Sequence, residues 1–499
     1  MYYGVPDDYE SIRTIGDLLD SEYEFADAPR QLRENLMMRL SDDDRYPGII
    51  GLDSDVIPAL DRAILAGHDV LLVGQIGQAK TRLAQVISST LLSPMPIIHG
   101  SITNDTPYDL PSAQLAALLQ SDDIASASSE FYISPESSEY IRDNGYDAKI
   151  RWVSGLDRSK FVVATPDITV KDMVGYIDVA KVAKKGVEMY DVSTYSPGYL
   201  MQAKHGIFCI DELPVLDTRK QVALLSVLQD GLFTAGSYPV VFRPRTVLFA
   251  TANPVDYTHS GRIIEPLYDR LKSHIRTRYP NTIQDEMRII LQEANTPKSA
   301  IISDTVLHVL AGIIRNVRAN PLVNQEKGVS VRMGIHGLEL LVAEAYRARP
   351  DAIPSPRISD MHCLYQVARF ELSEIDDTSQ NRHDTLHDVI NQTIQNYDDN
   401  INNVTMEPSD VDKIKSEFEG AEFHTSNTMS YIEQLQIFPT LYNIVEQFTS
   451  NGNFHTFNTK NKSEIKEAVM PVMVEIVLER LCRQTPKILE RRDSKYVLA

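Results

Sequence analysis

The sequence predicts an α/β fold in which a parallel sheet with flanking helices is followed by a helical lid and a helical C-terminal extension. A short apolar run at residues 69–74 ends in glycine and leads into a helical pattern, as a buried strand followed by a helix does. Two further apolar runs, 206–212 and 247–254, end in polar residues, which is typical of buried strands in a parallel sheet. Amphipathic helical spacing then dominates residues 280–375.

These patterns divide the 499 residues into four parts. In chain order they are an acidic N-terminal extension at 1–45, an α/β core at 46–280, a helical lid at 281–375 and a helical C-terminal extension at 376–499. Within the core, residues 106–160 are rich in Ser and Asp and interrupt the alternation of strands and helices. We therefore expect an insertion with helical pieces at this point.

The composition indicates a soluble globular protein, with 43% hydrophobic and 24% charged residues. No stretch approaches the length of a membrane-spanning helix, and the acidic N-terminus lacks the pattern of a signal peptide. The three cysteines form no metal-ligand or disulfide pattern, and Cys209, in an apolar run, is expected to pack in the core. We therefore expect a cytoplasmic location.

The formal net charge is −20, which argues against nucleic acid as the main partner. Proteins that bind nucleic acid neutralise phosphates and usually present a basic face. A local basic patch would still be compatible with this balance. The acidic charge favours protein partners instead.

The first chemical motif is a phosphate-binding loop after the first apolar run. Its residues are Gly74, Gln75, Ile76, Gly77, Gln78, Ala79, Lys80, Thr81 and Arg82. Backbone N–H groups of such a loop surround phosphate oxygens, the lysine contacts the β and γ phosphates, and the threonine hydroxyl binds Mg²⁺. Ala79 replaces the usual glycine before the lysine, which is tolerable if this residue has helical dihedral angles. The alternative is a strand, turn and helix with a surface lysine.

The second motif is a pair of carboxylates, Asp211 and Glu212, at the end of the run 206–212. Asp211 would hold Mg²⁺ together with Thr81, and Glu212 would polarise the attacking water as a general base. The alternative is that both acids only cap the next helix. The phosphate-binding loop upstream favours the catalytic interpretation.

Three further residues could contact the γ-phosphate. Asn253 ends the run 247–254 and could orient water, although Asn before Pro is also common in turns. Arg270 could neutralise charge in the transition state at a neighbouring subunit's site. Arg332 opens a helix of the lid and could reach the phosphate, or could simply be solvated. Rivals of Arg270 are Arg262, Arg276 and Arg278.

This order of motifs resembles the AAA+ ATPase family, and more narrowly the branch of the MoxR proteins and the I subunit of magnesium chelatase. The narrower resemblance rests on Asp172-Met-Val-Gly175-Tyr-Ile-Asp178, followed by Ser196-Pro-Gly-Tyr-Leu-Met-Gln-Ala-Lys-His-Gly206 and the acidic pair. The resemblance covers residues 49–348. No GAFTGA-like loop is present, so we do not expect a bacterial enhancer-binding activator.

The resemblance implies a Mg-ATP-dependent ATPase. Lys80 and Thr81 match the Walker A positions, Asp211 and Glu212 Walker B, Asn253 sensor 1, Arg270 the arginine finger and Arg332 sensor 2. Residues 231–245 are expected to form the hairpin that this branch inserts in helix 2 and that would line a ring pore. The resemblance also implies a homo-oligomer, a hexameric ring, and a partner with a von Willebrand factor A domain.

The preferred function is a MoxR-like motor that remodels or activates a partner protein complex. The first alternative is the motor subunit of a metal chelatase. A second is an AAA+ nucleic-acid motor, for which Arg243 and Arg245 are the only support. A third is a scaffold that binds nucleotide without hydrolysing it, against which the presence of Glu212 argues.

Overall fold

The computed structural model describes residues 2–120, 133–185, 192–231, 233–234, 241–254, 262–396, 408–425, 431–451, 453–456, 462–483, 487–492 and 495–499. The chain divides into two compact units, Met1–Arg278 and Tyr279–Ala499. Each unit has its own hydrophobic core and is described separately.

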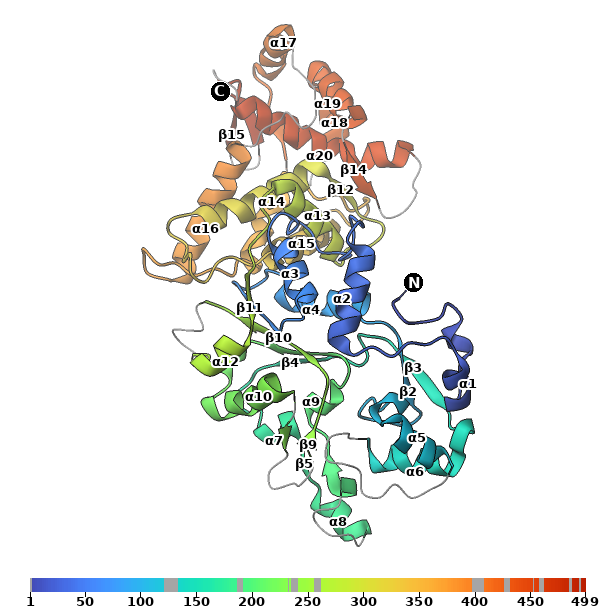
Figure 1. The fold of residues 1–499 in the computed structure, drawn as a ribbon. Helices are drawn as coiled ribbons and strands as arrows, with labels where there is room; N and C mark the ends of the chain where they lie inside the picture. Colours follow the sequence, from blue (N-terminus) through green and yellow to red (C-terminus); the bar gives the residue numbers. More distant parts are fainter. Residues whose placement is uncertain are drawn as a thin grey trace. The chain divides into compact units, whose positions relative to one another are not determined.

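The first unit is built on a five-stranded parallel sheet with the order β11-β1-β10-β7-β4 (Figure 1). The strands are β1 (Val70–Val73), β4 (Lys160–Val163), β7 (Ile207–Asp211), β10 (Val247–Ala252) and β11 (Ser273–Arg276). The α/β fold class predicted from the sequence is confirmed. The three strands expected from the apolar runs are β1, β7 and β10, and they lie side by side in the middle of the sheet.

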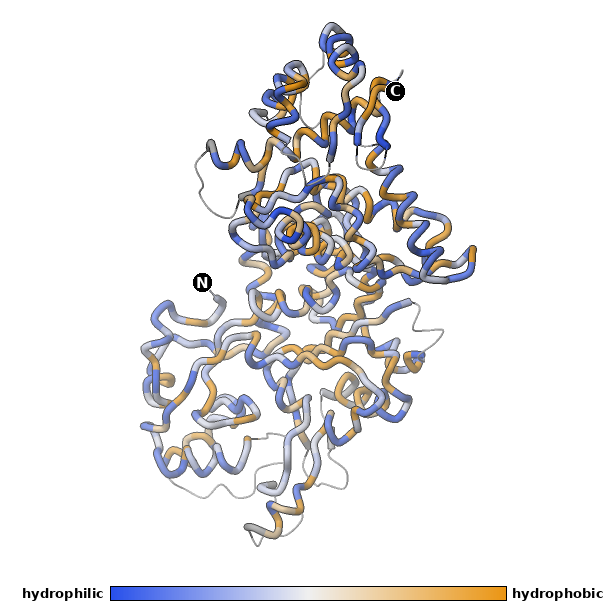
Figure 2. The backbone as a smooth tube through the Cα atoms, turned by 180° about the vertical axis from the view of Figure 1, so that it is seen from behind, coloured by the Kyte–Doolittle hydropathy of each residue, from blue (hydrophilic) through white to orange (hydrophobic). Residues whose placement is uncertain are grey.

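Both faces of the sheet are buried at β1, β7 and β10, which explains why these three strands are apolar without alternation. Along β1, Val70 and Leu72 belong to one buried cluster and Leu71 to another, because successive side chains point to opposite faces. The hydropathy colouring makes this apolar centre visible (Figure 2). Cys209 in β7 is fully buried, as expected, and burial raises the pKa of its thiol.

Helices cover the two faces of the sheet. One cluster includes residues of α2 (Ala28–Arg39), α3 (Val56–Leu65) and α4 (Lys80–Leu91), and the other residues of α9 (Tyr199–Gln202), α10 (Thr218–Asp230) and α12 (Glu265–Arg270). Each of α2 and α10 begins at an aspartate whose side chain accepts a backbone N–H, as in common N-terminal caps.

The residues expected to form an insertion contain helices and one strand. These elements are α5 (Ser112–Leu119), α6 (Pro135–Asn144) and β3 (Ile150–Val153), which pairs antiparallel with β2 (Met95–Ile98). They share an apolar cluster with α1 (Ile15–Asp20) of the N-terminal segment. Residues 121–132 lie outside the described residues. Lys160 is the first residue of β4 and thus part of the central sheet.

The expectation that residues 231–245 are an insertion within a helix is wrong. Helix α10 ends at Asp230, and the short hairpin of β8 (Phe233–Thr234) and β9 (Val241–Phe242) connects it to β10. The hairpin that does separate two short helices is β5 (Tyr176–Ile177) and β6 (Tyr195–Ser196), with α8 (Val179–Lys185) between its strands. It lies between α7 (Val170–Val174) and α9.

The two sequence segments that carried the chelatase-like resemblance meet at this second hairpin. Gly175 has a φ of 92°, which glycine adopts readily. A Cβ on Gly198 would lie 2.4 Å from the Gly175 nitrogen, so both positions require glycine. The two glycines therefore hold the segments in close backbone contact.

A buried ionic cluster joins distant parts of the first unit. The ammonium group of Lys204 lies 2.9 Å from Asp105 and 2.7 Å from Asp109, and His205 lies 2.9 Å from Asp109. Ser134 and Ser137 donate hydrogen bonds to Asp105. Burial is the largest single effect on the pKa of both aspartates and acts to raise it, but the Lys204 charge and the hydrogen bonds to the carboxylates together outweigh burial, so both pKa values are lowered. Burial lowers the pKa of His205.

Replacing Lys204 by Met should destabilise the first unit by about 3–5 kcal/mol, because two buried carboxylates lose their counter-charge. The wild type should lose stability as the pH falls from 7.5 to 5.5, since unfolding exposes His205 to protonation. The variant should gain stability over the same range, because carboxylates without a cation bind protons in the folded state. Urea unfolding at both pH values tests this. Lys171→Met, on an exposed lysine of α7, is the control and should change stability little.

The second unit contains helices and small sheets around one core. The helices are α13 (Ile283–Glu293), α14 (Asp304–Ala319), α15 (Arg332–Ala348), α16 (Ser379–Gln395), α17 (Pro408–Phe418), α18 (Tyr431–Leu435), α19 (Pro439–Asn451) and α20 (Lys462–Arg483). The strands are β12 (Ile301–Ser303) with β14 (Phe454–Thr456), and β13 (Phe423–His424), β16 (Lys495–Leu498) and β15 (Leu489–Arg492) in that order.

One hydrophobic cluster runs through the residues expected to be the lid and those expected to be the C-terminal extension. It includes Leu310 of α14, Leu386 of α16 and Val474 of α20, all fully buried. Strand β12 pairs with β14, which again joins the two segments. The strands of the C-terminal segment were not predicted. None of the helices in the described parts of the chain has an apolar stretch long enough to cross a membrane.

Candidate functional site

The phosphate-binding loop connects β1 to α4, as the sequence predicts. The backbone N–H of Gly74 donates to the carbonyl of Ala252, which ties the start of the loop to the end of β10. A Cβ at Gly74 would lie only 2.0 Å from the Thr277 hydroxyl, so glycine is required. Gly77 has a φ of 79°. Both glycines of the motif therefore serve the tight turn.

Side chains of the loop hold its backbone in place. The Lys80 ammonium group donates to the carbonyls of Gly74 at 2.6 Å and Gln75 at 2.9 Å. The Gln78 side-chain oxygen accepts from the Gln75 N–H at 3.0 Å and from the Thr277 hydroxyl at 2.9 Å. The loop is thus shaped before any phosphate is present, while the side chains of Ile76 and Arg82 are exposed.

Ala79 has left-handed backbone dihedral angles, with φ 58° and ψ 18°. The condition under which alanine would be tolerated without strain, helical dihedral angles, is therefore not met. A left-handed conformation costs an L residue with a Cβ about 1–2 kcal/mol relative to glycine. The loop keeps the backbone shape of a glycine position and contains strain there.

Replacing Ala79 by Gly should stabilise the first unit by about 1 kcal/mol, because the gain from relieved strain exceeds the added entropy of the unfolded chain. The Ala79 side chain is exposed, so no apolar burial is lost. Urea unfolding measures the change. The same substitution at Ala116, an exposed position within α5, should instead destabilise by about 0.5–1 kcal/mol. Equal signs at the two sites would contradict the strain at Ala79.

The acidic pair lies at the carboxyl end of β7, two strands from β1. Asp211 is the last residue of β7 and accepts a hydrogen bond from the Thr251 hydroxyl of β10. The Glu212 N–H donates to the same hydroxyl at 2.9 Å, and Glu212 has a φ of 58°. Glu212 is exposed. This local geometry turns the chain sharply after Asp211 and leaves the Glu212 carboxylate at the edge of the sheet.

Asn253 follows β10, which lies between β1 and β7 in the sheet. The parallel register places Ala252 opposite Val73 and Ala250 opposite Ile210, so the loop, Asn253 and the acidic pair share one edge. The carboxyl edge of a parallel sheet is where ligands of open α/β folds bind. The structure thereby brings together the residues that the sequence singled out from three separate strands.

The donor chemistry at this edge fits a magnesium ion. Thr81 lies in the first turn of α4, and a hydroxyl with a carboxylate such as Asp211 is the ligand set that Mg²⁺ takes beside phosphate oxygens. No group of three or more His, Cys, Asp and Glu that could hold a metal occurs among the described residues. A magnesium ion held by Thr81 and Asp211 would take further ligands from phosphate oxygens and water.

The four candidate finger arginines differ in their environment. Arg278 is bonded to Asp55, to the Gly51 carbonyl and to Ser54, so it is committed to the fold. Arg270 ends α12, is 45% exposed and, in the part of the chain that the structure describes, pairs only with its exposed neighbour Asp269. Arg262 and Arg276 are also exposed. Arg332 is the first residue of α15 in the second unit, where it is exposed.

Sequence reasoning missed two residues that shape the site, Thr251 and Thr277. Each hydroxyl contacts a residue of the motifs, Asp211 in one case and Gln78 in the other. A hydroxyl at the end of a strand beside the nucleotide loop is a usable signal. It is weak on its own, because threonine is common in strands.

Several known proteins are similar in sequence to this chain. Residues 189–276 match the family described as the Sigma-54 interaction domain, a span that includes the acidic pair, Asn253 and Arg270. The magnesium-chelatase subunit ChlI of Cyanophora paradoxa is 30% identical over 219 residues, covering 43% of this chain and 52% of ChlI. The ChlI subunit of Porphyra purpurea is 25% identical over 234 residues, covering 46% and 54%.

One further relative has no activity in its name, and one solved complex of chelatase subunits also matches. The uncharacterized protein YeaC of Bacillus subtilis (strain 168) is 25% identical over 173 residues, covering 33% of this chain and 50% of YeaC. The chain thus spans about half the length of these relatives. Among solved structures, a complex of the magnesium-chelatase subunits BchI and BchD matches with 17% identity and a TM-score of 0.33, covering 62% of this chain and 78% of that chain.

Proposed function

The chain is a member of the AAA+ ATPase family, in the branch that includes the I subunits of magnesium chelatase, and on that premise we propose that it hydrolyses Mg-ATP to drive changes in a partner protein complex. The observation that carries this proposal is the shared edge of β1, β10 and β7. There the phosphate-binding loop, Asn253 and the acidic pair lie on adjacent strands.

Each residue then has a stated role. Lys80 would exchange its two loop carbonyls for β and γ phosphate oxygens, which are stronger, charged acceptors. Thr81 and Asp211 would hold Mg²⁺, which neutralises the phosphate charge. Glu212 would accept a proton from the attacking water, and Asn253 would orient that water.

We propose that Arg270 completes the site of a neighbouring subunit in a ring, and that Arg332 contacts the phosphate from the lid. An exposed arginine with only a weak local partner is free to enter another subunit's site. The proposed assembly is a hexameric ring that works with a partner carrying a von Willebrand factor A domain. A cytoplasmic location remains a prediction.

A second candidate function is the motor subunit of a metal chelatase, which the similarity to two ChlI subunits favours. The chelatase function would require a large partner that binds a macrocycle. The structure gives no support to a nucleic-acid motor. Arg245 is half-buried, lies 3.7 Å from Asp109 and packs over the ring of Phe25, so it does not belong to an exposed basic face of the kind that nucleic-acid binding requires.

Capture of the client tests the proposed function. The Glu212→Gln protein, held in Mg-ATP, should retain its partner during affinity purification, because the ATP-bound state persists. Mass spectrometry of the retained proteins then separates the candidates. A von Willebrand factor A protein supports remodelling, and a macrocycle-binding subunit supports a chelatase. The control is Lys80→Ala in the same buffer, which should not bind ATP and should retain neither.

A further inference from the structure

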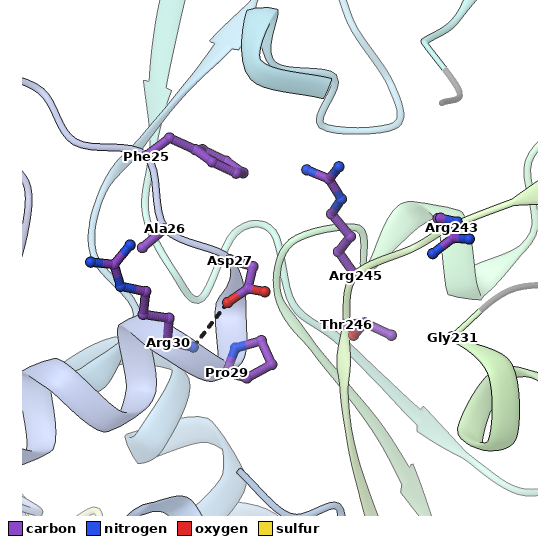
Figure 3. Close-up of a pocket in the computed structure, with 9 residues that line it drawn as sticks. All are labelled: Phe25, Ala26, Asp27, Pro29, Arg30, Gly231, Arg243, Arg245 and Thr246. Carbon is purple, nitrogen blue, oxygen red and sulfur yellow. Dashed lines mark hydrogen bonds between the residues drawn. The ribbon is translucent and has the colours of Figure 1, made fainter. Parts of the chain in front are cut away.

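A cavity of about 570 Å³ lies in the first unit, away from the phosphate-binding loop in sequence (Figure 3). Its wall comes from the segment before and at the start of α2 and from the base of the β8–β9 hairpin. The lining residues are Phe25, Ala26, Asp27, Pro29, Arg30, Gly231, Arg243, Arg245 and Thr246. Small-molecule sites in proteins have volumes of about 300–1,000 Å³, so a ligand of nucleotide size fits.

The three arginines that line the cavity differ in the contacts that their side chains make with other residues. Arg30 is bonded to Glu24 and to the Tyr3 hydroxyl, and in Figure 3 its guanidinium group lies away from Arg243 and Arg245. Arg245 shares Asp109 with Lys204 and His205, which lie closer to that carboxylate. Arg243 makes no ion pair with any residue in the described parts of the chain.

The Arg243 side chain is partly buried, and its hydrogen bonding is incomplete among the described residues. Its Nε atom is shielded from solvent and has no hydrogen-bond partner among the described residues. A second guanidinium lies behind the wall: Arg158 is fully buried and donates to Gln31, whose amide donates to the Ala26 carbonyl. Two nitrogens of Arg158 also lack partners there. Guanidinium N–H groups that are shielded from solvent and unpaired are costly, and an anion in the cavity that accepts from them would lower that cost.

The backbone beside the cavity is strained. Arg245 has a φ of 48° and His205 a φ of 64°, and the His205 N–H donates to the carbonyl of Pro244. Non-glycine residues with such angles persist where the surroundings enforce them, and they concentrate at ligand sites. The strain at Arg245 directs its side chain toward Phe25, over whose ring the guanidinium lies at 5.9 Å.

We propose that this cavity binds a small organic anion with a phosphate group, held by Arg243 and Arg245. A guanidinium group matches two phosphate oxygens at once, and Phe25 offers an apolar ring to the rest of the ligand. The one carboxylate on the wall, Asp27, accepts the Arg30 N–H at the start of α2 and is thereby stabilised by the helix. The site is separate from the one proposed for ATP hydrolysis.

Calorimetric titration with inorganic pyrophosphate and with AMP tests the proposal. The titrations use Lys80→Ala protein, in which the phosphate-binding loop is disabled, at constant ionic strength. We expect both probes to bind. Adding Arg243→Met should weaken binding about ten- to hundredfold, the effect of one charge-assisted hydrogen bond. Arg243→Gln, which keeps polarity without charge, provides a second variant if the first does not fold.

Arg219→Gln, on an exposed arginine of α10, is the matched control and should leave binding unchanged. Three results of the titrations of the proteins with and without the Arg243 substitution would overturn the proposal. They are no binding of either phosphate probe, equal binding with and without Arg243, and binding of citrate in place of both phosphate probes. An equal loss in the Arg219 variant would also overturn it, because binding would then reflect general charge.

Discussion

Replacing Glu212 by Gln is expected to lower ATP turnover about 10²- to 10⁴-fold while leaving ATP binding close to that of the wild type. The glutamine keeps the size of the side chain but cannot accept the proton of the attacking water. The Glu212 backbone N–H donates to the Thr251 hydroxyl, and the substitution leaves this contact in place. Phosphate release and binding of a fluorescent ATP analogue measure the two quantities.

The control for this variant is Glu265→Gln, on an exposed glutamate at the start of α12. It should leave turnover unchanged. Normal turnover in the Glu212 variant would sink the assignment of this residue as the base. A loss of ATP binding as well would mean that the substitution disturbs the loop and not the chemistry alone.

Replacing Arg270 by Ala is expected to lower turnover about 10³-fold or more, the effect of an arginine finger. The structure predicts little change in stability, because the side chain is 45% exposed and, within the described residues, pairs only with an exposed aspartate. Arg278→Ala should behave differently: it removes contacts to Asp55, Gly51 and Ser54 and should reduce stability first.

Mixing two inactive variants tests whether Arg270 acts on a neighbouring subunit. Arg270→Ala subunits keep Glu212, and Glu212→Gln subunits keep Arg270. In mixed rings, some interfaces combine one intact base with one intact finger. Random assembly of equal amounts should restore about a quarter of the wild-type turnover if the sites are independent. No recovery would exclude action between subunits and would move attention to Arg262 and Arg276.

The middle of the central sheet was predictable because β1, β7 and β10 are buried on both faces and lead into the residues of the candidate site. The apolar runs at β1, β7 and β10 are short and continuous, and polar motifs mark their carboxyl ends. Strand β4 begins at Lys160, where the expected insertion ends, and neither β4 nor β11 (Ser273–Arg276) ends in a motif that would single it out. The strands of the second unit escaped prediction because several are only two to four residues long and give no periodicity.

The candidate site was predictable at the level of residues and only partly at the level of backbone. Ala79 illustrates the limit: the sequence shows a missing glycine, and only the structure shows that the left-handed angle is retained. The hairpin at residues 231–245 illustrates another. Its existence was expected, but its position between α10 and β10 depends on where the helix ends. The cavity beside Arg243 could not be predicted from the sequence, because it forms where the start of α2 lies beside the base of the β8–β9 hairpin, two segments that are far apart in the chain.

The single core of residues 279–499 has a mechanical consequence. Side chains of α14, α16 and α20 are packed together without a break, so these helices cannot bend independently at low energy. If nucleotide state rotates the lid, the C-terminal segment moves with it as one stiff lever. In a rigid segment, a small rotation produces a larger displacement at residues that lie far from the axis of rotation. The exposed side chains of α17 and α19 would be displaced in this way.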